Sequence, residues 1–272
     1  SHTFRRGPGH TEIEPVMTGG MDNPVDVAFT PSGERILTAT FLEHPQLGRR
    51  DAIIHAIYGA VYGKPHAVIE GHPRTGDLLP VMTHLGPAVP SGLTRYTSAA
   101  FGETYRDNFF ATMFNLRKVT RNVLEPSGAT FVNRESDFLV SSSRDFHPTD
   151  VIEDADGSLL VVDTGAWYKL CCPTSQLAKP NVRGAIYRVK RKGARTASDP
   201  RGTKLAWSTM PVAQLAALLD DDRTAVRSRS IEQLGMRGAA AVADASSVLR
   251  SSGSATARLN AVWALTRIDG EP

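Results

Sequence analysis

Two aspartates hold the same position in two similar segments of the chain. Asp26 lies in Asn-Pro-Val-Asp-Val and Asp150 lies in His-Pro-Thr-Asp-Val, and a Gly-containing turn follows each of them. A carboxylate can serve as a general acid or base, but a catalytic group need not recur in every repeat. Because aspartates beside turns commonly accept backbone N–H bonds, we expect Asp26 and Asp150 to be structural.

Other residue types that carry chemistry give weaker patterns. Ser91 lies in Pro-Ser-Gly-Leu and not in a Gly-x-Ser-x-Gly elbow, which argues against a hydrolase nucleophile. Five histidines crowd one third of the chain without a tight metal-ligand spacing, so hydrogen bonding in loops is favoured over metal ligation. They are His44, His55, His66, His72 and His84.

Two aromatic residues and two cysteines follow a predicted strand. Trp167 and Tyr168, beside Asp163, suit either a stacking platform for a sugar ring or an aromatic core cluster. The adjacent Cys171 and Cys172 allow a vicinal disulfide, two free thiols or metal ligation. The spacing of these residues leaves each choice open.

The elements that must position these residues are of two kinds. Short β-branched and aromatic runs, broken by Gly, Pro, Asn and Asp, predict strands near 25–29, 35–40, 109–114, 158–162 and 185–189. From Pro211 the apolar residues recur with helical spacing, and 225–234 superposes on 256–265 with a period of 31. The second pattern resembles HEAT-type helical repeats.

The strand pattern itself repeats. Segments beginning at Pro24, Pro90 and Pro148 share a strand and turn order at intervals of about 60 residues, which is typical of β-propeller blades. A β-sandwich with coincidental hairpins is the alternative. We therefore predict a mainly β chain: three to four propeller blades over 1–192, a basic linker over 193–210, and truncated HEAT-like helices over 211–272.

Composition excludes several classes of protein. The chain has 272 residues, 41% of them hydrophobic, with 31 basic and 28 acidic residues, and no apolar run long enough to span a bilayer. The basic residues between Arg183 and Lys204 are interpreted as a solvated linker, not as a nucleic-acid surface, because no aromatic residues interleave with them. Three blades and two helical repeats are too few for finished architectures, so we expect a fragment.

The segments 23–33, 51–65, 88–96 and 146–157 occur in an order that resembles the soluble quinoprotein glucose, sorbosone and aldose dehydrogenase propellers. Together with Cys171-Cys172-Pro173, the segment 184–189 and the helices, the chain most resembles multidomain "membrane-bound dehydrogenase" propeller proteins of planctomycete-type bacteria. The resemblance covers about residues 15–265. It implies oxidation of a sugar or alcohol with pyrroloquinoline quinone and calcium as cofactors, and a haem c domain downstream of this chain.

The resemblance also assigns roles to residues. The quinone contacts fall on His147, Thr149 and Asp150, and near Asn115 and Arg117; the catalytic residue is not in this chain. Where the family has paired arginines, this chain has His147 and Thr149, so we expect weak or altered quinone binding. The proposed substrate contacts are Ser91, Tyr96, Trp167 and Tyr168.

Two functions follow from these patterns. The first is a sugar or alcohol dehydrogenase exported to the periplasm, which passes electrons to a haem domain or a cytochrome c. The second is a non-catalytic module that binds carbohydrate, or binds protein partners through its HEAT-like helices. No nucleic-acid partner and no metal ligand set is predicted.

Overall fold

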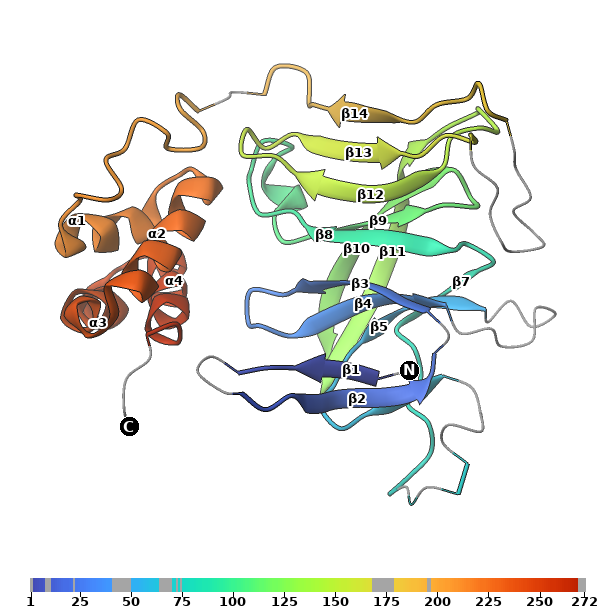
Figure 1. Cartoon of the computed structure of the whole chain (residues 1–272), viewed down its shortest axis with the longest axis horizontal. Helices are drawn as coiled ribbons and strands as arrows, with labels where there is room; N and C mark the ends of the chain where they lie inside the picture. Colours follow the sequence, from blue (N-terminus) through green and yellow to red (C-terminus); the bar gives the residue numbers. More distant parts are fainter. Residues whose placement is uncertain are drawn as a thin grey trace.

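Strands make up most of the chain up to Val189, and helices follow from Val212 (Figure 1). The computed structural model describes residues 2–7, 11–21, 23–40, 50–63, 70–71, 73, 75–167, 179–194 and 197–268. The expectations for His44, His66, His72, Tyr168, Cys171 and Cys172 fall outside these residues.

The described strands form four sheets, which follow one another in chain order except that β6 returns to the first sheet (Figure 1). The first contains β1 (His2–Arg5), β2 (Glu14–Gly20) and β6 (Val61–Gly63). The second contains β3 (Asn23–Phe29), β4 (Arg35–Thr40), β5 (Asp51–His55) and β7 (Thr83–Gly86). The third contains β8 (Pro90–Arg95), β9 (Phe109–Met113), β10 (Lys118–Ser127) and β11 (Thr130–Val140), and the fourth contains β12 (Pro148–Glu153), β13 (Leu159–Asp163) and β14 (Ala185–Val189).

The five strands predicted from local composition are confirmed as β3, β4, β9, β13 and β14. Neighbouring strands of the described sheets pair antiparallel except β2 and β6, which are parallel. The register shifts at Pro24/Asp26, at Pro90/Leu93 and at Pro148/Asp150, so each repeat carries an irregularity at the same point of its first strand. The sequence repeat is therefore a structural repeat as well.

The first strands of the last three sheets lie beside one another. The Asp26 carboxylate of β3 accepts a hydrogen bond from the Leu93 N–H of β8 (2.7 Å), and the Tyr96 hydroxyl after β8 donates to the Gly157 carbonyl after β12 (2.6 Å). Buried apolar clusters fill the space between successive sheets. We call the side where β3, β8 and β12 begin the strand-start edge, and the opposite side the strand-end edge.

A long hairpin, β10–β11, ties the third sheet to the second. At its tip Thr130 Oγ1 lies 3.1 Å from His55 Nδ1, and Glu34 Oε2 lies 2.9 Å from His55 Nε2. The buried His55 is in strand β5 and not in a loop, but its ring is used for hydrogen bonding, as the sequence predicts.

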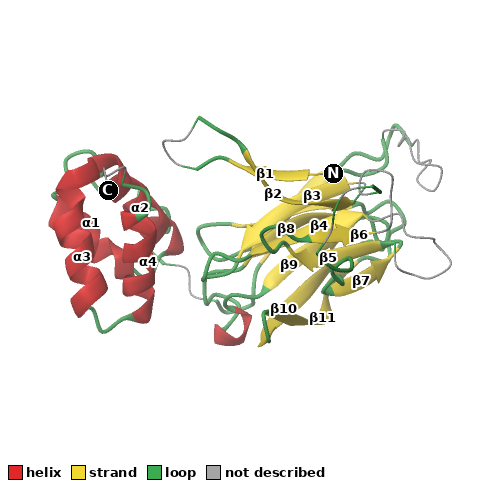
Figure 2. Ribbon diagram, turned by 90° about the horizontal axis from the view of Figure 1, so that it is seen from below, coloured by secondary structure: helices red, strands yellow, loops and turns green. Residues whose placement is uncertain are grey.

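The helical segment packs around its own apolar core beside the strand-end edge (Figure 2). It contains α1 (Val212–Ala217), α2 (Thr224–Arg237), α3 (Val242–Ser251) and α4 (Ala255–Leu265). The predicted pair of equivalent segments thus falls on α2 and α4. Trp263 of α4 lies against Gly33 in the β3–β4 turn: a Cβ on Gly33 would stand 2.8 Å from the indole ring.

Three members of the basic run are exposed and also form ion pairs, which the sequence did not indicate. Arg188 and Arg201 pair with Asp154, and Arg188 and Lys190 pair with Asp156, in the turn between β12 and β13. The run therefore fastens the connection between strands and helices to this acidic turn.

In the part of the chain that the structure describes, no helix is long and apolar enough to cross a membrane.

Candidate functional site

Loops from three sheets meet along the strand-start edge. The Asp51 carboxylate accepts a hydrogen bond from Val89 N–H (2.7 Å), and the Val89 carbonyl accepts one from Phe114 N–H (3.2 Å). The Phe114 ring lies 4.7 Å from the His147 ring. These contacts form a continuous path from the second sheet to the fourth.

Asp51 is a deeply buried acid of this edge. Its side chain is fully buried, and burial raises its pKa despite the Val89 hydrogen bond and the charge of Arg50. Its Oδ1 lies 3.7 Å from Arg50 Nε, and neither atom has a hydrogen-bond partner among the described residues. Val89 adopts a positive φ of 49°, which is unfavourable for a β-branched residue.

His147 and Asp163 form the next part of the edge. Asp163 Oδ1 accepts hydrogen bonds from His147 N–H (2.9 Å) and Gly165 N–H (2.8 Å). His147 Nδ1 lies 3.1 Å from the Asp145 main-chain oxygen. Asp163 is only 7% exposed, and its Oδ2 bonds to none of the described residues.

A groove of about 750 Å³ opens beside Asp163, between the end of β11 and strand β14. Its volume is in the range of small-molecule sites. Hydroxyl, carboxylate, guanidinium and aromatic groups all line it. The lining includes Ser141, Ser142, Ser143, Asp145, Phe146, Asp163, Arg183 and Tyr187.

Tyr187 and Arg183 are among the lining side chains that are presented to solvent. Tyr187 is 47% exposed, and its ring packs edge-on against buried Phe146 at 5.9 Å, which fixes its orientation. Arg183 is exposed, and its guanidinium makes no hydrogen bond or ion pair with the described residues. A planar aromatic face next to a carboxylate and a guanidinium is the set of groups that recognises a polyhydroxylated ring.

The residues predicted to bind the quinone are near one another but largely occupied. The Asn115 amide donates to the Pro87 carbonyl (3.3 Å), and the Thr149 hydroxyl donates to the Val162 carbonyl (3.4 Å). His147 is buried against Phe114. Only the half-buried Arg117, which has a positive φ of 55°, makes no side-chain bond within the part of the chain that the structure describes.

Asp150 lies deeper than the edge, in the row formed by β3, β8 and β12. Its Oδ1 accepts the Val151 N–H (2.8 Å), as Asp26 Oδ1 does from Val27 N–H. A Cβ on Gly92 of β8 would stand 2.3 Å from that oxygen. Burial, opposed by the Val151 hydrogen bond and aided by the charge of Asp26, raises the pKa of Asp150. The hydrogen bonds of both aspartates agree with the predicted structural role.

The four proposed substrate contacts separate. Ser91 is half-buried in β8, where its carbonyl accepts from the Thr38 hydroxyl (2.8 Å). Trp167 is 56% exposed and follows the turn that binds His147, so it lies at the strand-start edge. Tyr96 is fully buried at the strand-end edge, where it packs against Phe101 and Phe110 and supports the core. Its position removes it from the site.

The sequence did not indicate the groove. Asp145, Arg183 and Tyr187 belong to segments up to about 40 residues apart and share no motif. The aromatic and acidic residues around Asp163 were the single local signal. Among the described residues, no three of His, Cys, Asp and Glu gather in a way that could hold a metal ion.

The family described as "Domain of unknown function (DUF7133)" matches residues 74–194, which include the third and fourth sheets and the groove. A search of the curated proteins found no significant match.

Among solved structures, an oxidoreductase (glucose dehydrogenase) from Thermus thermophilus is similar at 16% identity over 63% of this chain, with a TM-score of 0.42. The PQQ-bound aldose sugar dehydrogenase from Streptomyces coelicolor is similar at 13% identity over 67% of this chain, also with a TM-score of 0.42. A further glucose dehydrogenase shows 19% identity over 63% of this chain and a TM-score of 0.43. This chain spans 46%, 47% and 46% of those chains, respectively.

Proposed function

We propose that residues 2–194 are part of a β-propeller of the quinoprotein sugar dehydrogenase type, and that the groove beside Asp163 binds a sugar. The observation that carries the sugar proposal is the composition of the groove: Tyr187 for the ring face, and Asp163 and Arg183 for the hydroxyl groups. Three consecutive sheets with adjacent first strands and the same irregularity support the propeller.

The residues of this edge do not fit pyrroloquinoline quinone. A tricarboxylate requires cationic donors free to face it. Here Asn115 and Thr149 already donate to carbonyls, and Asp150 is itself an acid. Of the residues predicted to contact the quinone, Arg117 alone has a guanidinium, and that group makes no bond to the described residues. We therefore assign no redox step to these residues.

This mismatch favours the second candidate function, a binding module without catalysis of its own. In a longer protein, quinone and calcium contacts and a haem domain or cytochrome c acceptor would come from residues outside this chain. We also propose that the chain is exported to the periplasm and is part of a planctomycete-type multidomain protein. The sequence resemblance supports both points.

Calorimetric titration of the chain with a panel of aldoses and sugar alcohols tests the proposal. We expect millimolar or tighter binding of at least one sugar, and at least fivefold weaker binding by Tyr187→Ala and by Arg183→Gln. Tyr58→Ala removes a similarly exposed tyrosine near the first sheet and is the matched control. Absence of binding, or equal loss in the control, would refute the sugar site.

A second titration separates the two candidate functions. Pyrroloquinoline quinone with calcium, added with an electron-accepting dye and the sugar that binds, should give neither quinone binding nor dye reduction by this chain. Tight quinone binding would show that the edge rearranges to hold the cofactor, and the binding-module alternative would then be discarded.

A further inference from the structure

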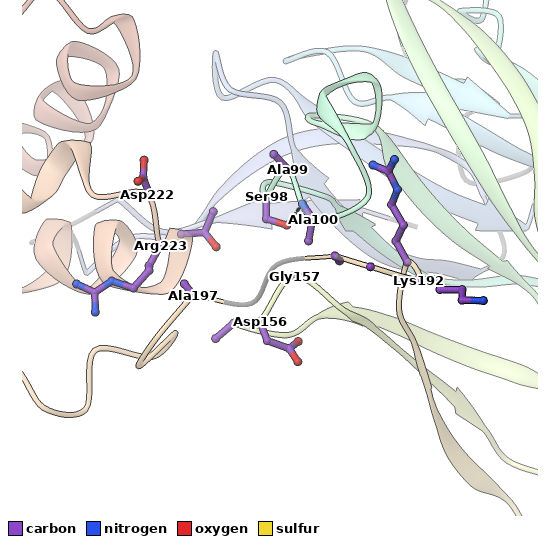
Figure 3. A pocket seen from close by; sticks show the side chains of 14 residues that line it. Ser98, Ala99, Ala100, Asp156, Gly157, Lys192, Ala197, Asp222 and Arg223 are labelled. Atoms are coloured by element: carbon purple, nitrogen blue, oxygen red, sulfur yellow. Dashed lines mark hydrogen bonds between the residues drawn. The ribbon is translucent and has the colours of Figure 1, made fainter.

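Two cavities that share Thr224 and open to solvent lie where the strand-end edge meets the helices. The larger one, about 530 Å³, is shown in Figure 3 between the turn at Asp156–Gly157 and the start of α2 at Asp222–Arg223. The smaller one, about 140 Å³, is several times the ~30 Å³ that one water occupies in the liquid. Its polar lining includes Arg95, Thr97, Arg106, Asp107, Thr224, Arg227, Ser228, Thr256 and Asn260.

Three guanidinium groups line the smaller cavity: Arg95 at the end of β8, Arg106 in the β8–β9 connection and Arg227 in α2. Arg95 donates through Nη1 to the Phe29 carbonyl (2.9 Å), but its buried Nε has no hydrogen-bond partner among the described residues. Arg227 donates through Nη1 to the Asp221 carbonyl (2.6 Å) and pairs with no carboxylate of the described chain. Two cationic side chains are thus held in the cavity wall with unused donors.

The acidic groups nearby are mostly committed elsewhere. Glu103 forms a two-bond pair with Arg106, at 2.9 and 3.1 Å. Glu153 accepts from Thr97 N–H, the Thr97 hydroxyl and Ser98 N–H. Asp107, the one carboxylate among the described residues that line the cavity, forms an ion pair with Arg95, whose Nε lies 3.6 Å from Asp107 Oδ1, too far for a hydrogen bond.

The electrostatics of Arg227 point the same way. Burial is the largest cause of its lowered pKa, and the charge of Arg106 is the next, ahead of the opposing charges of Asp221 and Glu153. Burial also lowers the pKa of Arg95, against the charges of Asp107 and Glu153. Each charged guanidinium would be better compensated by an anion placed between them.

We propose that the smaller cavity binds a tetrahedral oxyanion of the phosphate class, free or carried on a larger molecule, between Arg95 and Arg227, with the charge of the Glu103-bonded Arg106 beside it. Arg95 and Arg106 belong to the strand part and Arg227 to α2, so the bound anion also fastens the helical segment to the strand-end edge. Thr224 and Ser228 supply hydroxyl donors beside the guanidinium groups.

Titration with inorganic phosphate at low ionic strength, followed by calorimetry and by the melting temperature, tests the site. We expect saturable binding, a melting temperature that rises with phosphate beyond the effect of equal chloride, and at least tenfold weaker binding in Arg95→Gln and Arg227→Gln. Arg250→Gln, an exposed arginine on α3, is the control and should bind as the parent does. Circular dichroism establishes that each variant is folded.

Absence of saturable phosphate binding, or binding that is equal in Arg95→Gln and the parent, would overturn the proposal. If Arg227→Gln does not fold, Arg95→Gln decides alone. A sugar phosphate in place of inorganic phosphate distinguishes the two sources of the anion: tighter binding of the sugar phosphate indicates a carried group that extends into the cavity of Figure 3.

Discussion

At the scale of single residues, Gly92 shows how the repeat is adapted to its neighbours. The position that holds aspartate in β3 and β12 is glycine in β8, between those strands. The Asp26 carboxylate accepts the neighbouring Leu93 N–H, and the Asp150 carboxylate lies where a Gly92 side chain would be. A third aspartate there would be excluded by space and by the charges of the other two.

Gly92→Ala should therefore destabilise the chain. The added Cβ would stand 2.6 Å from the Asp150 Cα, so β8 and β12 must separate, at a cost of about 1–3 kcal/mol. Urea unfolding measures the loss. Gly76→Ala, at a glycine with open space around it, should change stability by under about 0.5 kcal/mol, and equal effects of the two substitutions would contradict this packing.

Asp163 lies at the strand-start edge and also lines the groove. Asp163→Asn keeps an acceptor for His147 N–H and Gly165 N–H but removes the charge, so we expect a folded protein whose sugar affinity falls by about threefold to tenfold. Asp163→Ala also removes the acceptor and should lose about 1–3 kcal/mol of stability. If Asp163→Asn binds sugar as the parent does, this carboxylate does not contact the ligand.

At the scale of elements, the acidic turn between β12 and β13 holds the connection to the helices. For Asp154, burial raises the pKa, but Arg188 and Arg201 with a backbone hydrogen bond outweigh it and the net pKa is lowered. For Asp156, burial is likewise outweighed by Lys190 and Ser158. The basic partners of these acids lie 30 or more residues along the chain, so the sequence alone does not reveal these ion pairs.

The attachment of the segment 190–204 to the acidic turn should weaken at low pH. Because both carboxyls have a lower pKa in the folded chain than in the unfolded chain, their stabilisation is complete above the ordinary aspartate pKa of about 4 and is lost as the pH falls below it. Limited proteolysis of the segment 190–204 at pH values above and below about 4 measures this loss of attachment. With an acid-active protease, we expect faster cleavage at the lower pH values.

The double variant Asp154→Asn, Asp156→Asn should reproduce that loosening at neutral pH. The partner side chains are 42–64% exposed, so we expect a stability loss of only about 1 kcal/mol, together with a weaker dependence of cleavage on salt. Asp137→Asn, which breaks the surface pair with Lys118, is the control. Unchanged cleavage in the double variant would show that the acidic turn does not hold the connection.

At the scale of the whole molecule, the strands and helices can be predicted from the sequence because they depend on local residue patterns. Alternating β-branched runs and Gly turns located β3, β4, β9, β13 and β14, and apolar spacing located the helices. The groove could not be predicted, since Asp163, Arg183 and Tyr187 meet only when β13 and β14 pair. The sequence also does not reveal that Tyr96, which follows β8, donates its hydroxyl to the Gly157 carbonyl at the strand-end edge.

The sheets and the helical segment therefore present two separate sites: a groove for a sugar between β11 and β14, and a guanidinium cavity for an oxyanion at the strand-end edge. The two sites share none of their described lining residues. Phosphate should consequently leave sugar affinity unchanged within twofold, as competition calorimetry would show.

A crystal structure of the chain soaked with the tightest-binding aldose would show whether the groove beside Asp163 binds a sugar. We expect a sugar ring against the Tyr187 face, with hydroxyl groups within hydrogen-bond distance of Asp163 and Arg183. A sugar bound elsewhere, or an empty groove at saturating aldose, would contradict it.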